Sequence, residues 1–130
     1  MRMNKRAHYS IPDANQKAIV SELRYIFGKD SVRVCNTKDG SGDIELGIFD
    51  LFNLKFEIKN PDSGHGLTKK QSKFAATWQG QIKTIYDAAD ALTEARKYAK
   101  LIGFCAKFDI KIAVFGYVVS EAGQVSKIVN

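Results

Sequence analysis

The spacing of apolar side chains changes along the chain between the period of a helix and that of a strand. Apolar residues recur every three or four positions in residues 13–28 and again after Asp87, which is typical of helices with one buried face. A shorter helix is predicted over residues 68–78, where Thr68 and Gln71 have the spacing of a capping box. Three helices are therefore expected, separated by strand-like segments.

Between these helices, apolar and polar residues alternate with the period of a strand. Residues 43–49 and 51–59 predict a β-hairpin around Asp50. Further strands are expected over residues 31–36, 81–86, 111–119 and 124–129, the last two forming a second hairpin around residues 120–123. This order of elements predicts one mixed α/β domain over residues 1–130, with an antiparallel start and a crossover helix.

The composition agrees with a single folded domain. The chain has 130 residues, of which 45% are hydrophobic and 11% aromatic, enough for one core. No run of 18 apolar residues exists, so neither a transmembrane helix nor a membrane partner is expected. Residues 1–12 look like a basic arm without the apolar stretch of a signal peptide, and Cys35 and Cys105 are widely spaced. We therefore expect a cytoplasmic protein with free thiols.

The charge favours an anionic partner without identifying it. The formal net charge is +6 and the sequence pI is about 9.3, a moderate bias toward polyanions such as nucleic acid. The basic residues are spread along the chain, however, with short local pairs at Lys69–Lys70 and Arg96–Lys97 and no long basic run. Charge alone therefore predicts no particular binding surface.

The first hairpin carries charged residues where they can meet. Alternate side chains of a strand share a face, so Glu57 and Lys59 lie together. If the hairpin loop comprises residues 50–52, Asp43 lies across from Lys59, and Glu45 lies across from Glu57. Directly opposed carboxylates repel each other unless a cation lies between them. This register is an assumption, and it brings two carboxylates and a lysine together.

Such a group could bind a hard cation. Mg²⁺ is held by one or two carboxylates together with water and phosphate oxygens, and Asp43 and Glu57 could supply the carboxylates. The backbone carbonyl of Ile58 is a candidate third ligand, and Lys59 could orient water or stabilise charge on a phosphate. A solvated hairpin face with alternating lysine and glutamate fits the same spacing, so spacing alone leaves both interpretations open.

The pattern also resembles a known family. Asp43 followed by Glu-Ile-Lys at 57–59 resembles the PD-(D/E)XK nuclease motif. The turn GSGDI, the stretch FEIKNPDSGHGLTKKQSKF and the stretch GQIKTIYDAADAL resemble, in order, successive motifs of the VRR-NUC family. The resemblance covers roughly residues 13–92. It implies a nuclease core of helix, antiparallel hairpin sheet, helix, strand and helix, to which residues 93–130 add a C-terminal helix and hairpin.

The resemblance implies an activity and a site. Stand-alone members of the family resemble dimeric Holliday-junction resolvases, so it implies a Mg²⁺- or Mn²⁺-dependent DNA endonuclease that acts as a homodimer on branched or duplex DNA. Asp43, Glu57 and Lys59 match the motif residues, and Gln71 matches a glutamine that lies near the site in related nucleases. Gln71 therefore has two interpretations, as a catalytic residue and as half of the capping box.

Two departures from the family pattern matter. Gly42 stands where the family usually has proline, and we expect glycine to make the same turn at some entropic cost. Gln16 stands where many relatives carry a metal-binding glutamate, and a neutral amide is a poorer ligand. Glu22 and Glu45 are the candidates for the missing acid.

The sequence also offers candidate DNA contacts: Asn36, Lys38, His65, Lys69 and Lys73. Flaps, nicked DNA or ordinary duplex are alternative substrates for an enzyme of this kind. A different class of function is a catalytically silent DNA- or protein-binding module on the nuclease scaffold, which the neutral Gln16 keeps open.

Overall fold

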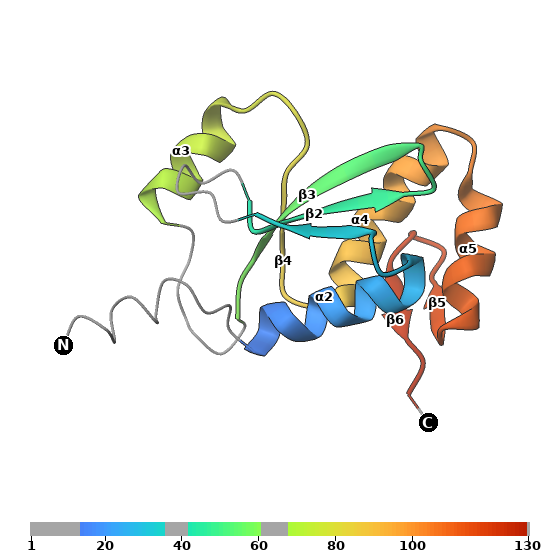
Figure 1. The fold of residues 1–130 in the computed structure, drawn as a ribbon. Helices are drawn as coiled ribbons and strands as arrows, with labels where there is room; N and C mark the ends of the chain where they lie inside the picture. Colours follow the sequence, from blue (N-terminus) through green and yellow to red (C-terminus); the bar gives the residue numbers. More distant parts are fainter. Residues whose placement is uncertain (1–13, 36–41, 61–67, 130) are drawn as a thin grey trace.

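A computed structural model describes residues 14–35, 42–60 and 68–129. Its centre is a four-stranded sheet of order β1-β2-β3-β4 (Figure 1). The strands are β1 (Val32–Val34), β2 (Ile44–Ile48), β3 (Phe52–Ile58) and β4 (Lys83–Ile85), with a separate hairpin of β5 (Tyr117–Val119) and β6 (Val125–Lys127). The helices are α2 (Ala14–Phe27), α3 (Lys69–Thr77), α4 (Ala88–Leu101) and α5 (Cys105–Val114). The predicted mixed α/β class is confirmed.

The first three strands are antiparallel, and β4 joins β3 in parallel after the crossover through α3. The helices α2 and α4 supply the helical side of the core, and α5 and the β5–β6 hairpin pack against α4. The least exposed side chains of the core include Leu23, Ile26, Ile44, Leu46, Ile48, Phe56, Ile85, Ala91 and Leu92. No helix in the described ranges is long and apolar enough to cross a membrane.

The predicted helix boundaries agree closely with the structure. Gly28 follows α2 with φ +114°, a conformation that side chains other than glycine rarely adopt. Thr68 and Gln71 form the expected capping box, and the Asp87 side chain caps α4 by accepting a hydrogen bond from Asp90 N at 2.8 Å. The helical spacing after Asp87 would also place Ile102 on the buried face of α4, but this is wrong, because Ile102 is the C-cap and is 51% exposed.

The helix α5 was not predicted, and the expected strand over residues 111–119 is wrong in its first half. β-Branched residues suggested a strand there, but Phe108 and Ile112 are buried four residues apart, which is helical spacing. Gly116, with φ +88°, separates this helix from β5. Packing of one helical face against the core therefore outweighs the local strand propensity.

The register of the first hairpin also differs from the expected one. Glu45 lies across from Lys55, and Ile48 lies across from Phe52, so the loop comprises residues 49–51. Each residue of β2 is thus displaced by two positions along β3, which keeps the same side chains on the same face. The predicted pairing of Glu45 with Glu57 is wrong.

The β5–β6 hairpin is tied to the first helix of the described chain. The Glu22 carboxylate accepts hydrogen bonds from the Tyr117 hydroxyl at 2.6 Å and from Lys127 Nζ at 3.0 Å. These bonds lower the pKa of Glu22, and burial together with Glu22 raises the pKa of Tyr117. Glu22 therefore fastens the hairpin to α2.

Replacing Tyr117 with phenylalanine is expected to destabilise the fold by about 1–2 kcal/mol, because a hydrogen bond to a charged acceptor is lost while Lys127 remains. The urea midpoint of unfolding measures the change. Tyr25→Phe is the matched control, since Tyr25 is 71% exposed. Equal midpoints for both variants would contradict this role for the Tyr117 hydroxyl.

Candidate active site

Asp43 and Glu57 meet where β2 begins and β3 ends. The Asp43 backbone N–H donates to the Phe56 carbonyl at 2.8 Å, and its Oδ2 accepts a hydrogen bond from the Ile58 backbone N–H at 2.7 Å. The Asp43 carboxyl is also within hydrogen-bonding reach of the Glu57 carboxyl. The structure therefore brings the two predicted acids together, and it fixes one of them by a backbone donor.

Glu57 is a buried carboxyl beside another carboxyl. The residue is only 4% exposed. This burial is the main cause that raises the pKa of the Glu57 carboxyl to about 8. The hydrogen bond with Asp43 and the repulsion from its charge raise the pKa further, while Lys59 and Gln71 oppose the shift. Near neutral pH the pair therefore keeps a proton unless a cation replaces it.

Gln71 connects the acids to the lysine. Its Nε2 donates to Glu57 Oε2, and its Oε1 accepts from Lys59 Nζ at 2.8 Å and from Thr68 N at 2.9 Å. The Gln71 backbone N–H in turn donates to Thr68 Oγ1 at 3.2 Å. Both interpretations of Gln71 are therefore compatible, since one side chain closes the capping box and also orders the candidate site.

Two further side-chain amides form hydrogen bonds with the backbone of the strands that carry the site. Asn15 Nδ2 donates to the carbonyls of Lys59 at 2.9 Å and Tyr86 at 3.2 Å, joining the ends of β3 and β4 to α2. Gln81 accepts from Lys55 N at 2.6 Å and donates to Lys55 O at 3.0 Å, as a paired strand residue does. Sequence reasoning missed both residues. The available signal was that Asn15 lies near the start of a predicted helix and Gln81 at the start of a predicted strand.

The donor set fits a hard divalent cation. Among the described residues, no three His, Cys, Asp or Glu side chains form a group able to hold a metal. Two carboxylates are nevertheless what a Mg²⁺ site usually takes from the protein, with water and phosphate completing the shell. The N–H and C=O of one strand residue point to the same side, so the Ile58 carbonyl lies on the edge of β3 nearer Asp43.

The candidates for a third metal-binding residue have other contacts than the Asp43–Glu57 pair. Glu45 lies in a cross-strand row with Arg33, its ion-pair partner, and Lys55. Glu22 binds the C-terminal hairpin, about 10 Å along α2 from Asn15. Gln16 lines a depression of about 350 Å³ between α2 and Val34 and adds no charge. Glu45 and Glu22 therefore bind other partners and Gln16 is neutral, so none of the three supplies the site with a further negative charge.

Gly42 does not make the turn expected of a proline. Its φ is +115°, whereas the proline ring holds φ near about −65°. A Cβ at this position would also lie 3.2 Å from the Phe56 carbonyl oxygen. The expectation that glycine only replaces proline in a shared turn is therefore wrong, and this backbone approaches β3 in a way that favours glycine.

The candidate DNA contacts are placed only in part. Asn36, Lys38 and His65 lie outside the described residues. Lys69 and Lys73 are exposed and share one face of α3, about 200° around the helix from Gln71. Lys70, which is not among the predicted DNA contacts, is exposed at about 100° from Gln71 and so lies nearer the site.

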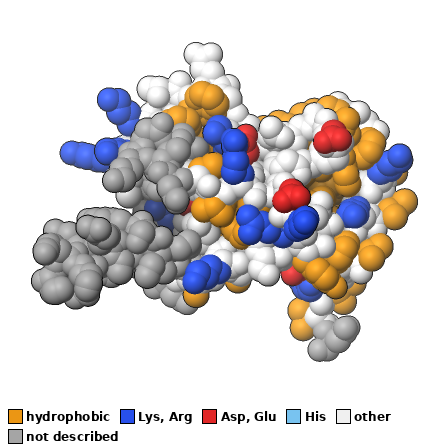
Figure 2. Space-filling model, viewed as in Figure 1, with side chains coloured by type: hydrophobic (Ala, Val, Ile, Leu, Met, Phe, Trp, Pro, Cys, Tyr) orange, Lys and Arg blue, Asp and Glu red, His pale blue; other side chains and the backbone are white. Residues whose placement is uncertain are grey.

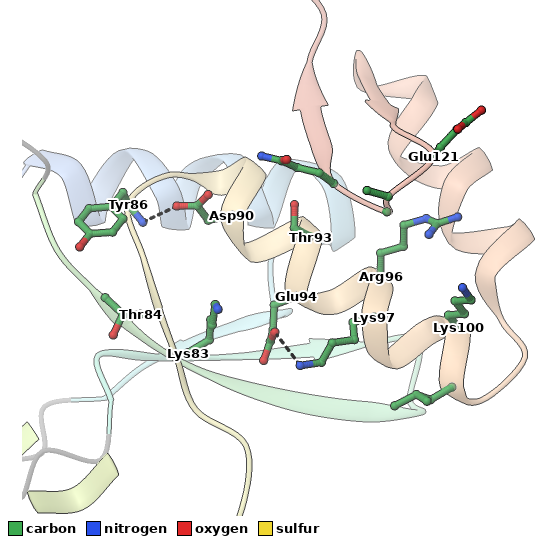
Figure 3. A pocket seen from close by; sticks show the side chains of 14 residues that line it. Lys83, Thr84, Tyr86, Asp90, Thr93, Glu94, Arg96, Lys97, Lys100 and Glu121 are labelled. Carbon is green, nitrogen blue, oxygen red and sulfur yellow. Dashed lines mark hydrogen bonds and ion pairs between the residues drawn. The ribbon is translucent and has the colours of Figure 1, made fainter. Parts of the chain in front are cut away.

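A cleft of about 1060 Å³ opens between β4, α4 and the β5–β6 turn (Figure 3), and neither Asp43 nor Glu57 is among the residues that line it. Its charges are mixed and partly paired. Lys97 lies 3.5 Å from Glu94, and the Asp90 carboxylate accepts from Tyr86 N at 2.9 Å. Arg96 forms two hydrogen bonds with Asp109 on α5. These contacts stabilise the fold and point to no ligand.

Comparison with known proteins finds no match among family models, curated proteins or solved structures. Any functional argument for this chain therefore depends on the geometry of its own residues.

Proposed function

We propose that this chain is a metal-dependent endonuclease that hydrolyses phosphodiester bonds in DNA. The observation that carries the proposal is the carboxylate pair Asp43–Glu57, joined to Lys59 through the side chain of Gln71. The order of α2, three antiparallel strands, α3 and a parallel β4 is the order expected of a PD-(D/E)XK nuclease core. The order of the elements and the grouping of these residues both support this activity.

A divalent cation fits the pair. Mg²⁺ or Mn²⁺ bound by Asp43 and Glu57 would take the place of the proton on Glu57 and relieve the repulsion between the two carboxylates. Such a cation supplies Lewis acidity to the attacking water and to the scissile phosphate. Because Glu57 must lose its proton first, binding of the cation is expected to strengthen as the pH rises.

The remaining residues position the phosphate and each other. Lys59 carries three N–H donors and a positive charge, which suit the charge that develops on a phosphate under attack. Gln71 is a positioning residue, since it holds both Lys59 Nζ and the Glu57 carboxyl from one amide. Asn15 fixes the backbone at Lys59 itself. Glu57 and Lys59 are thereby held in one orientation before substrate arrives.

Branched DNA is the proposed substrate, with a homodimer as the active form. Cutting two strands of a four-way junction symmetrically calls for two sites related by a two-fold axis. The part of the chain after residue 92 offers an apolar face for this contact. Ile110 and Val114 lie one helical turn apart on α5, at 67% and 74% exposure. These exposed positions support an interface there.

Cleavage of a labelled four-way junction and of linear duplex, each with and without Mg²⁺, tests the proposal. We expect strand cleavage only with the cation, and faster cleavage of the junction. Cleavage of both substrates at equal rates would retain the nuclease but remove the preference for branched DNA. Absence of cleavage with Mg²⁺ and with Mn²⁺ would contradict the activity.

One observation favours the alternative of a catalytically silent binding module. Glu45 and Glu22 are engaged elsewhere and Gln16 is neutral, so the site has two acids where relatives are expected to have three. Calorimetric titration with Mn²⁺ separates the two functions. A nuclease site should give a heat of binding that Asp43→Asn abolishes, whereas a silent module should bind no cation at the pair.

A further inference from the structure

The helix α3 is unusually open for an element next to a candidate site. None of its nine residues is buried, and it lies at the margin of the sheet, apart from the layer of α2 and α4 (Figure 1). It contains three lysines and no acid: Lys69, Lys70 and Lys73. Lysine and arginine side chains project from this part of the surface (Figure 2). Such a helix suits contact with a polyanion.

One face of α3 carries aromatic rings beside the site. Gln71, Phe74 and Trp78 are spaced three and four residues apart, so they share this face. Phe74 and Trp78 are stacked, with ring centroids 5.1 Å apart and planes at 25°. Aromatic residues at this spacing are more often found in a core or a dimer contact, but neither ring is buried here, and Trp78 is 43% exposed.

The indole of Trp78 is held in place although it is exposed. Its Nε1 donates to the Gln81 carbonyl at 3.2 Å, and Phe74 stacks against the ring. Gly80 leaves room for the ring, since a Cβ there would lie 2.6 Å from Trp78 Cζ2. An exposed aromatic ring held by a hydrogen bond and a stacked neighbour presents a prepared surface rather than a freely rotating side chain.

We propose that Trp78, backed by Phe74, stacks with an unpaired base of the DNA strand that enters the candidate site. Every base has an apolar face, so stacking recognises single-stranded DNA without reading its sequence. Trp78 follows Gln71 by seven residues, or about 10 Å along the helix axis, which corresponds to roughly three nucleotides of a stacked strand. This inference rests on the proposed function and adds to it a preference for unpaired bases about three nucleotides from the cut.

Trp78 is the single tryptophan of the chain, which makes the test direct. Its fluorescence is followed while a single-stranded oligonucleotide of about 12 nucleotides is added to the full chain in EDTA, where cleavage is prevented. We expect quenching by single-stranded DNA and little quenching by duplex of the same length. No quenching by single-stranded DNA at saturation would overturn the proposal.

Variants give a second, independent measurement by anisotropy of labelled DNA. Trp78→Ala should weaken binding of the single strand by about 5- to 150-fold and leave duplex binding nearly unchanged, while Trp78→Phe should retain most of the affinity. The matched control is Lys69→Gln with Lys73→Gln, which should weaken both forms alike through lost phosphate contacts. Equal loss for both forms in Trp78→Ala, or a change of its oligomeric state instead, would overturn stacking.

The failure of this inference can be told apart from failure of the proposed function. Quenching without any metal-dependent cleavage would leave a single-strand-binding helix on a chain that is no nuclease. Cleavage without quenching would retain the nuclease and remove Trp78 from its substrate contacts.

Discussion

Asp43→Asn is expected to reduce metal-dependent DNA cleavage by at least about 100-fold, the order of loss found when one charge-stabilising group is removed from an active site. Asparagine keeps the size of the side chain and an oxygen that can accept from Ile58 N, so the hairpin should stay intact. What it removes is the negative charge beside Glu57. The initial rate of junction cleavage in Mg²⁺ measures the effect.

Glu45→Gln is the matched control for this substitution. Both residues are acids of the same hairpin, two positions apart, but Glu45 pairs with Arg33 on the neighbouring strand. We expect its cleavage rate to stay close to that of the unaltered chain. If Glu45→Gln lost as much activity as Asp43→Asn, Glu45 would be the missing metal-binding acid after all, and the arrangement of the site would have to be revised.

Asp43→Asn has a second consequence that does not depend on activity. The Asp43 carboxyl raises the pKa of Glu57 by hydrogen bonding and by repulsion, although burial remains the larger cause. Removing the charge should therefore lower the pKa of Glu57 without returning it to the value of a free side chain. Carboxyl ¹³C chemical shifts followed against pH measure this value directly.

In the absence of divalent cations, the melting temperature is expected to fall by several degrees as the pH rises from about 4.5 to 8. The pKa of Glu57 is about 8 in the folded chain against 4.5 for the unperturbed group. Between these values the folded state binds more protons than the unfolded state, so the free energy of unfolding decreases as the pH rises. Thermal unfolding monitored by circular dichroism across this range tests the direction.

Two glutamate variants separate this effect from others. Glu57→Gln cannot ionise, so its melting temperature should lose most of the decrease between pH 4.5 and 8. Glu22→Gln should instead change the dependence of the melting temperature on pH at acidic values. The lowered pKa of Glu22 contributes stability above about pH 4.5 that is lost as the pH falls through its folded value. If the melting temperature of Glu57→Gln still fell by the same amount between pH 4.5 and 8, Glu57 would not be the source of the decrease.

The same experiment with Mn²⁺ reports on the cation site. A cation that binds the ionised pair stabilises the folded state by mass action, and it does so most where the pair has lost its proton. Mn²⁺ should therefore raise the melting temperature more at pH 8 than at pH 5. An equal rise at both values would place the bound cation elsewhere.

The elements with strong local signals were predictable from the sequence. Gly28, the Thr68–Gln71 box and Asp87 mark helix ends through chemistry that acts over a few residues, and all three ends are where the pattern put them. α5 could not be found in this way. Its β-branched residues favour a strand, and only contacts of Phe108 and Ile112 with distant parts of the core decide for a helix.

The hairpin register was beyond local reasoning for a different reason. Loops at 49–51 and 50–52 have the same length and differ in which residues leave the strands. The structure uses the first, with Phe49 at φ 54° and Asp50 at φ 61°. A phenylalanine in the left-handed region is unfavourable by itself, so no turn rule would have chosen it. Burial of Ile48 opposite Phe52 accompanies this choice.

The sequence was enough to predict which residues form the candidate site, but not which hydrogen bonds and ion pairs they make. Alternation along β3 was enough to place Glu57 and Lys59 on one face, and a shift by two positions preserves that face. The role of Glu45 was not predictable, because its partner Arg33 comes from a third strand. The bridge through Gln71 depends on where α3 docks, which the spacing of residues does not reveal.

The attachment of the last hairpin to α2 also bears on how the chain folds during synthesis. Tyr117 and Lys127 reach Glu22 across 95 and 105 positions of sequence. At about 5–20 residues per second, the ribosome takes on the order of 5–20 s to add the hundred residues between them. During that interval α2 and the sheet can form while the Glu22 carboxylate lacks both partners. During synthesis these two bonds can therefore form only after every residue of the four-stranded sheet has been added to the chain.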